Sequence, residues 1–289
     1  MNEPYDIVII GGGPAGLSAG LYAARARLNT LIVERSKYGG QASTTADLEN
    51  YPGSIPDCTG PSLSERMRQQ AEGFGAKFLR DEIIGLDTSE KIKTIKCGNG
   101  ELNAKTVIIA SGANPSLAGF KGESEFRGKG VSYCATCDAD FFTDLDIAVI
   151  GGGDSALTEA LYLTKFVNKL TLIHRRDSFR AAKSLQERIF ANPKIDIIWN
   201  SIVTEAFGDE ILEGLKVKNK LTGEVVSLDV NGVFVFVGLN PISELYRGIV
   251  DMDDKGYIIT DAEMKTKVPG IFAAAVITCL SGFCLTSPA

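Results

Sequence analysis

Two stretches of the sequence decide the fold, and each joins an apolar run to a glycine-rich turn. They read Asp6-Ile-Val-Ile-Ile-Gly11-Gly12-Gly13-Pro14-Ala15-Gly16 and Asp146-Ile-Ala-Val-Ile-Gly151-Gly152-Gly153-Asp154-Ser155-Ala156. Glycines let the backbone turn tightly from a strand into a helix and approach a pyrophosphate, whose charge sits at the helix N-terminus. One such loop alone is weak evidence, but each copy here follows an apolar strand and opens a helix. The sequence therefore predicts two dinucleotide-binding α/β units.

The similarity between the two halves continues past the glycines, which indicates an internal duplication. Residues 30–35 are echoed by 171–176, and Ser111-Gly112-Ala113-Asn114-Pro115 is echoed by Val237-Gly238-Leu239-Asn240-Pro241. The Asn-Pro pairs mark where the chain passes between the two copies. We predict domains at 1–115 with 244–289 and at 116–243.

Each copy is expected to be a three-layer, Rossmann-like α/β unit with an added β-hairpin. The apolar, β-branched runs at 107–110 and 233–236 are bounded by Gly and Pro, as is typical of buried parallel strands. Alternating residues around Gly98-Asn99-Gly100 and around Thr222-Gly223 predict antiparallel hairpins.

Composition indicates an ordinary globular enzyme in a reducing compartment. The 289 residues are enough for about two domains. The net charge of −6 and the lack of a dense basic tract argue against a nucleic-acid or anionic-membrane surface. Six scattered cysteines are too few for a disulfide scaffold of this size. The start, Met1-Asn2-Glu3-Pro4, is short and acidic, so we expect no targeting segment before the fold.

The residue after the second strand differs between the copies, and this difference predicts which nucleotide each binds. Glu34 ends that strand in the first copy, where a carboxylate can accept hydrogen bonds from a ribose 2′-hydroxyl. The second copy has His174, Arg175 and Arg176 there, with Arg180 one turn on. Guanidinium groups at this place match a 2′-phosphate. A solvated helix start is the alternative, but the position at a strand end favours NADPH.

Between the two loops lies Cys134-Ala135-Thr136-Cys137-Asp138, which predicts a redox dithiol. The same spacing also serves zinc sites and structural bridges. His174 is the only histidine, which excludes a two-histidine zinc site and disfavours a Ser-His-Asp hydrolase. Asp138 is the natural group for proton transfer, with a turn-capping carboxylate as the alternative. Two nucleotide sites and one dithiol predict an electron relay.

Together these residues resemble the low-molecular-weight, bacterial-type thioredoxin reductases over about residues 4–274. The resemblance implies that the first nucleotide is FAD and the second NADPH, and that thioredoxin is the substrate. It also implies a cytoplasmic homodimer in which Cys137 faces the flavin and Cys134 exchanges with the protein substrate. The motifs that carry it are Gly11-x-Gly13-x-x-Gly16, Gly39-Gly40-Gln41, Glu49-Asn50-Tyr51-Pro52-Gly53, Cys134-Ala135-Thr136-Cys137-Asp138, Gly151-x-Gly153-x-x-Ala156 and His174-Arg175-Arg176-x-x-x-Arg180.

Motifs and resemblance together define the expected site residues, none of which is a metal ligand. The catalytic residues are Cys134, Cys137 and Asp138. The FAD-binding residues are Gly11, Gly13, Pro14, Ala15, Gly16, Glu34, Arg35, Gly40, Gln41, Asn50, Ala110, Ser111 and Gly112. The NADPH-binding residues are Gly151, Gly153, Asp154, Ser155, Ala156, His174, Arg175, Arg176 and Arg180.

The resemblance changes after Ala274. The family continues with Gly-Asp, whose carboxylate binds the flavin ribityl chain, and then adds a helix that contains Arg-Gln. This chain reads Ala275-Val276 there, followed by residues 277–289. A truncated, FAD-deficient reductase that still binds NADPH is therefore an alternative function.

Three further alternatives remain from the sequence. The substrate could be another thioredoxin-like or peroxiredoxin-type protein. Cys279 and Cys284 could form a second redox pair, although their spacing does not match known mobile dithiols. The uncharged stretch 268–289 could anchor in a membrane, although Pro269 and Gly270 disfavour it.

Overall fold

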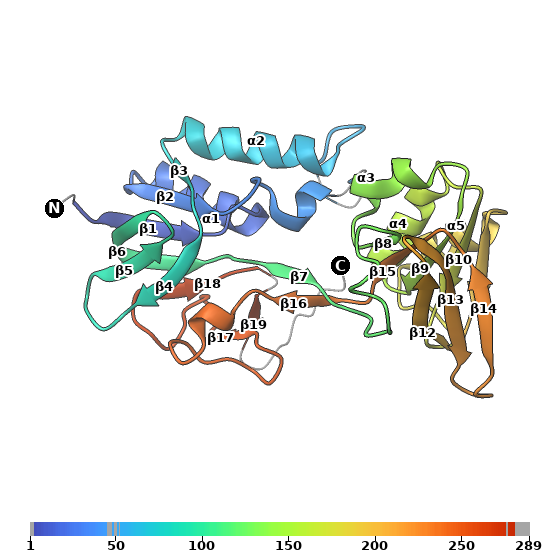
Figure 1. The fold of residues 1–289 in the computed structure, drawn as a ribbon. Coiled ribbons are helices and arrows are strands. Elements are labelled where there is room, and N and C mark those ends of the chain that lie inside the picture. The colour runs from blue at the N-terminus through green and yellow to red at the C-terminus, as the bar shows by residue number, and fades with distance from the viewer. Residues whose placement is uncertain (1–2, 45–47, 49–50, 52, 276, 281–289) are drawn as a thin grey trace. The chain divides into compact units, whose positions relative to one another are not determined.

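The chain folds into two compact units, and each is described by itself. The computed structural model (Figure 1) describes residues 3–44, 48, 51, 53–275 and 277–280. One unit runs to Asn114 and resumes at Asn240, and the other runs from Pro115 to Leu239. Both crossings therefore fall at the Asn-Pro pairs. The crossing segments, β7 (Ala113–Pro115) and β16 (Leu239–Pro241), pair with each other.

The first unit is built on a sheet of order β3-β2-β1-β6-β5-β4, with β18 also paired to β6. The strands β3, β2, β1, β6 and β18 run parallel, whereas β4, β5 and the start of β6 are antiparallel. Helices α1 and α2 pack on one face through Leu17, Ala24 and Ala71 (Figure 1). The elements are β1 (Tyr5–Ile10), α1 (Pro14–Arg25), β2 (Thr30–Glu34), η1 (Gly40–Thr44), α2 (Gly60–Gly73), β3 (Lys77–Arg80), β4 (Ile83–Asp87), β5 (Lys93–Cys97), β6 (Gly100–Ile109), η3 (Glu244–Tyr246), β17 (Ile258–Thr260), β18 (Ile271–Ala273) and β19 (Thr278–Leu280).

The second unit has a parallel sheet of order β11-β10-β9-β15-β8 between two covering layers. Leu157, Leu163 and Ile189 pack helices α4 and α5 on one face. The antiparallel sheet β12-β13-β14 covers the other face through Leu215 and Val217 (Figure 1). The elements are β8 (Val131–Ser132), α3 (Ala135–Asp138), η2 (Ala139–Phe142), β9 (Asp146–Gly151), α4 (Asp154–Leu163), β10 (Lys169–Ile173), α5 (Lys183–Ala191), β11 (Ile195–Ile198), β12 (Ser201–Gly208), β13 (Leu212–Asn219), β14 (Val225–Asp229) and β15 (Gly232–Phe236).

The predicted fold class is confirmed. The parallel orders β3-β2-β1-β6 and β11-β10-β9-β15 match strand for strand, as a duplication requires. Both predicted hairpins form, between β5 and β6 and between β13 and β14. The apolar runs become buried parallel strands because helices or a second sheet cover both faces. Across the described residues, no helix combines the length and apolar character needed to cross a bilayer.

Some predictions concern parts of the chain beyond this description. Asn50, Val276 and Cys284 lie outside the described residues, as do residues 281–289 of the uncharged stretch 268–289. Cys279 lies in β19, which pairs with β17 in parallel register.

Candidate functional site

The first glycine loop leaves no room for side chains where the strand turns into the helix. Gly11, directly after β1, has φ +111°, and a Cβ there would lie 2.2 Å from the carbonyl oxygen of Ala110. A Cβ on Gly16 would lie 1.9 Å from the carbonyl oxygen of Gly11. A Cβ on Gly13, by contrast, would meet only Gly40, at 3.9 Å. The loop therefore leaves no space for a side chain at Gly11 and Gly16, and it leaves open space at Gly13. This arrangement lets the backbone approach a pyrophosphate closely.

Replacing Gly16 by alanine is expected to lower both the flavin content and the thermal stability. The oxygen that the new Cβ would meet belongs to the backbone of the strand–helix turn, so relief requires the turn itself to move. Such overpacking costs about 1–3 kcal/mol. The measurements are bound flavin per chain from the visible spectrum and the midpoint of thermal unfolding. Gly73→Ala is the control, because a Cβ there meets nothing within 4 Å.

Glu34 lies beside this loop at the end of β2. Its Oε2 accepts the Gly12 N–H at 2.7 Å, and its Oε1 accepts the Ser36 N–H at 2.9 Å. These two bonds hold the carboxylate against the loop, and the remaining lone pairs are available to hydroxyl groups. Arg35, the next residue, is exposed.

The Gly39-Gly40-Gln41 segment packs onto the same loop. Gly39 donates its N–H to the carbonyl oxygen of Gly12 at 2.7 Å. The Gln41 side chain donates through Nε2 to the carbonyl oxygen of Ala113 at 3.2 Å. Residues 11–16 and 39–41, predicted as one flavin site, are therefore neighbours in the first unit.

The other predicted flavin residues lie just after β6 and at the start of α1. Ala110 is buried and donates its N–H to the carbonyl oxygen of Ile10, while the Ser111 hydroxyl donates to the carbonyl oxygen of Ile242 at 2.6 Å. Gly112 has φ +69° close to the crossing between the units. Pro14 and Ala15 are the first two residues of α1.

The second glycine loop repeats this design with one change. A Cβ on Gly151 would lie 2.6 Å from the carbonyl oxygen of Phe236, the counterpart of the contact between Gly11 and Ala110. Ala156 takes the place of the third glycine and lies buried at the start of α4. Gly153 caps α4, and Asp154 and Ser155 are its first two residues.

Two hydrogen bonds tie the basic segment to this loop. Arg180 donates its backbone N–H to the carbonyl oxygen of Gly152 at 2.9 Å, and the Asp154 carboxylate accepts the Ala182 N–H at 2.7 Å. The side chains of Arg175, Arg176 and Arg180 are exposed. In the described part of the chain, none of these guanidinium groups pairs with a carboxylate. Their charge is therefore available to an anion at the loop.

His174 lies beneath the same loop and not beside the arginines at the surface. Its ring is buried, and a Cβ on Gly152 would lie 2.3 Å from it. Burial lowers the pKa of His174 below its ordinary value; backbone hydrogen bonds with Gly151 and Ser178 oppose this shift, and the charges of Arg176 and Arg175 add to it. Among the described residues, Nε2 has no hydrogen-bond partner. A buried imidazole nitrogen without a partner next to the glycine loop fits a site that a ligand completes.

The predicted dithiol is present as a disulfide in the second unit. Cys134 and Cys137 are bonded, with their Cα atoms 5.4 Å apart. Cys137 is exposed, whereas Cys134 and Asp138 are half-buried. Cys134 directly precedes α3, a single turn that ends at Asp138. The Asp138 carboxylate accepts a hydrogen bond from the Ser132 hydroxyl at 2.6 Å.

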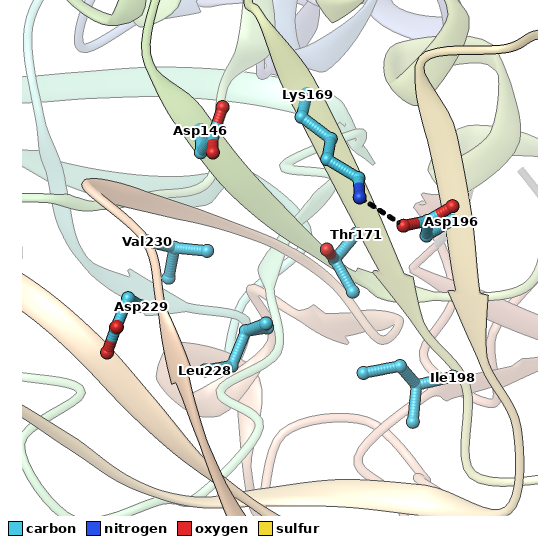
Figure 2. A pocket seen from close by; sticks show the side chains of 8 residues that line it. All are labelled: Asp146, Lys169, Thr171, Asp196, Ile198, Leu228, Asp229 and Val230. Carbon is cyan, nitrogen blue, oxygen red and sulfur yellow. Dashed lines mark ion pairs between the residues drawn. The ribbon is translucent and has the colours of Figure 1, made fainter.

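A separate pocket of about 270 Å³ is lined by residues at the amino ends of β9 and β10 and by residues of β11 and β14 (Figure 2). Asp146 and Lys169 are the first residues of β9 and β10, whereas both glycine loops follow the carboxyl ends of their strands. Ligands of open α/β sheets bind at the carboxyl ends. Lys169 pairs at 2.5 Å with Asp196 on the neighbouring strand β11. The position of this pocket distinguishes it from the nucleotide site.

Two residues that support the Cys-x-x-Cys segment were not predicted from the sequence. Ser132 was not singled out, although it precedes the Cys-x-x-Cys motif by two residues. Glu123 was also missed: it is buried, and it accepts hydrogen bonds from the Tyr133 hydroxyl at 2.7 Å and from the Gly119 N–H at 2.6 Å. Desolvation, together with this hydrogen bond, raises the pKa of Tyr133. A buried glutamate near the motif carries no sequence signal that separates it from a surface acid.

The chain is similar to known reductases over nearly its whole length. Residues 5–280 match the model of the pyridine nucleotide-disulphide oxidoreductase family. The thioredoxin reductase of Peptoclostridium acidaminophilum is 53% identical over 283 residues, 96% of this chain and 90% of that protein. That of Listeria monocytogenes is 45% identical over 271 residues, 93% of this chain and 85% of that protein. The crystal structure of Lactococcus lactis thioredoxin reductase is 44% identical and gives a TM-score of 0.93 over 95% of this chain and 90% of that one. The chain therefore belongs to the thioredoxin reductase family and is an NADPH-dependent flavoprotein disulfide reductase.

Proposed function

We propose that the protein uses the Cys134–Cys137 pair to reduce the disulfide of thioredoxin with electrons from NADPH. The observation that carries this proposal is the disulfide itself, held in the same unit as the basic nucleotide loop, with Asp138 in the same helical turn. The dithiol and the relatives' names support thioredoxin as the partner. We further propose a homodimer, as the family resemblance implies. We propose the cytoplasm as its location, in line with the few and scattered cysteines.

The residues of the two loops fit the two cofactors. In the first unit, Gly11, Gly13 and Gly16 would hold the pyrophosphate of FAD, and Glu34 would accept hydrogen bonds from its ribose. In the second unit, Gly151 and Gly153 would hold the pyrophosphate of NADPH, and the basic residues would hold its 2′-phosphate. With FAD bound, the first unit would supply the two-electron chemistry that connects NADPH to a disulfide. The basic residues meant here are Arg175, Arg176 and Arg180. His174 would support the nucleotide loop from beneath, where its ring lies against Gly152.

The exchange itself needs only the reduced cysteine pair and a proton source. A thiolate of the pair attacks one sulfur of the partner disulfide, forming a mixed disulfide and releasing a partner thiolate. The second cysteine then attacks the mixed disulfide, closing the Cys134–Cys137 bond and releasing the second partner thiolate. Each released thiolate takes up one proton, so one dithiol and one disulfide give one disulfide and two thiols. Asp138 is the group that we assign to this proton transfer.

A visible spectrum and a turnover assay test this proposal directly. The purified protein should show the absorption of bound flavin and should reduce oxidised thioredoxin at the expense of NADPH. A folded, colourless protein would support the FAD-deficient alternative instead. A flavoprotein that leaves thioredoxin oxidised but reduces a peroxiredoxin-type protein would support the reductase activity and contradict thioredoxin as its substrate.

Replacing Asp138 by asparagine is expected to lower the rate of thioredoxin reduction by about a hundredfold or more, the usual effect of losing a general acid. Asparagine keeps the shape of the side chain and can still accept a hydrogen bond from Ser132, but it cannot give a proton to a thiolate. The measurement is kcat with saturating thioredoxin. Asp140→Asn is the matched control, because Asp140 is exposed two residues further along the same segment. Equal rates for the two variants would remove Asp138 from the mechanism.

A further inference from the structure

We propose that Ser132 is a positioning residue for the exchange reaction, and that its hydroxyl holds Asp138 in one place in both of its protonation states. This inference rests on the proposed role of Asp138. It adds the residue that would keep the Asp138 carboxyl group in position from one proton transfer to the next. Ser132 is the last residue of β8 and is only 4% exposed, so its hydroxyl is shielded from water.

Three hydrogen-bonding groups surround the Ser132 hydroxyl. The Cys134 backbone N–H donates to Oγ at 3.1 Å. The hydroxyl faces two acceptors, Oδ2 of Asp138 at 2.6 Å and the carbonyl oxygen of Cys134 at 3.3 Å. The single hydroxyl therefore links the first residue of the Cys-x-x-Cys-Asp motif to the last.

These contacts can be satisfied whether Asp138 is charged or neutral. A serine hydroxyl has one proton to donate and two lone pairs to accept with. When Asp138 is ionised, the hydroxyl donates to Oδ2, and the Cys134 N–H fills one lone pair. When Asp138 is protonated, the carboxylic acid donates to the second lone pair, and the hydroxyl proton turns to the Cys134 carbonyl oxygen.

In both states the Ser132 hydroxyl, the Cys134 N–H and Oδ2 of Asp138 keep a hydrogen-bond partner, so none of these three groups carries the energetic cost of a lost partner. Asp138 can therefore lose a proton to a thiolate and regain one without moving its carboxyl group. An apolar side chain at position 132 would leave the carboxylate without this donor, and the Cys134 N–H without its acceptor.

The test compares Ser132→Thr with Ser132→Val, two variants that match in shape and differ in the hydroxyl. The protein is reduced with dithiothreitol, freed of reductant and mixed with oxidised thioredoxin, and the single-turnover exchange rate is followed, so that NADPH plays no part. We expect the Ser132→Thr variant to stay within about threefold of the parent. The Ser132→Val variant should exchange about tenfold more slowly or worse, the loss expected for one hydrogen bond to a charged group.

A double-mutant cycle separates positioning from packing. If Ser132 acts through Asp138, Ser132→Val should change the rate by less than about threefold once Asp138 is replaced by alanine. Equal slowing by the threonine and valine substitutions, or a full valine effect in the Asp138→Ala background, would overturn the inference. An Asp138→Ala protein that exchanges at the parent rate would instead refute the proposed role of Asp138. Ser132→Ala replaces Ser132→Val in this cycle if thermal unfolding shows that the valine variant does not fold.

Discussion

Serine in place of either Cys134 or Cys137 is expected to stop NADPH-dependent disulfide reduction, with turnover falling by more than about a thousandfold, as for loss of a nucleophile. Both sulfurs are needed, because the first forms the mixed disulfide and the second resolves it. The structure shows the two already bonded to each other and held by one helical turn. The measurement is the rate of thioredoxin reduction at saturating NADPH.

Two buried cysteines in the first unit provide the control for this prediction. Cys58 and Cys97 are free thiols with 4% and 6% exposure. Cys58→Ala and Cys97→Ala should keep turnover close to that of the parent, apart from any loss of folded protein. Full turnover in Cys134→Ser or Cys137→Ser would remove the dithiol from the mechanism.

The same variants also test which sulfur meets the substrate. The family resemblance assigns exchange with thioredoxin to Cys134, although the structure leaves Cys137 the more exposed of the two. We expect the Cys137→Ser protein to trap a mixed disulfide with a thioredoxin that lacks its resolving cysteine. Trapping by Cys134→Ser alone would reverse the assignment.

Replacing Arg175 and Arg176 together by alanine is expected to raise the KM for NADPH about a hundredfold and to leave the KM for NADH nearly unchanged. A hydrogen bond to a charged group contributes about 1.5–3 kcal/mol, and about 1.4 kcal/mol corresponds to a factor of ten. Both side chains are exposed, and neither pairs with a carboxylate in the part of the chain that the structure describes. Among the described residues, no carboxylate therefore competes with the 2′-phosphate of NADPH for these two guanidinium groups.

The matched control removes the same charge elsewhere in the second unit. Lys218 and Lys220 lie at the end of β13 and just beyond it, and Lys218→Ala with Lys220→Ala should leave both KM values unchanged. Initial rates over a range of each nucleotide give the comparison. Equal use of NADPH and NADH by the parent protein would contradict the assignment of these arginines.

Local patterns in the sequence were sufficient to predict the fold. Short β-branched runs, glycine turns and two hairpin signals each act over a few residues, so their outcomes can be predicted without knowing what packs against them. The repeat of Gly11–Gly16 at Gly151–Ala156 then placed the two loops at equivalent strand ends, as the matching sheet orders confirm. The family, the cofactor pair and the dithiol also followed from these motifs.

Contacts between distant residues could not be predicted in this way. The sequence shows that Glu34 ends a strand, but only the fold brings its carboxylate 2.7 Å from the Gly12 N–H, 22 residues away. Likewise, the backbone of Arg180 bonds to Gly152, far back along the chain, and His174 is covered by that same glycine. Periodicity indicates which face of an element is buried, and says nothing of which polar group lies opposite.

By itself, the sequence determined that this protein has two nucleotide loops, one basic and one acidic at the ribose position, and a cysteine pair between them. Only the tertiary structure decided how the reacting groups are held. Ser132 and Asp138 share no motif, yet a two-residue strand and a single helical turn bring their side chains to 2.6 Å, with the hydroxyl buried. A buried hydroxyl must find partners, and the folded chain alone determines which partners are within reach.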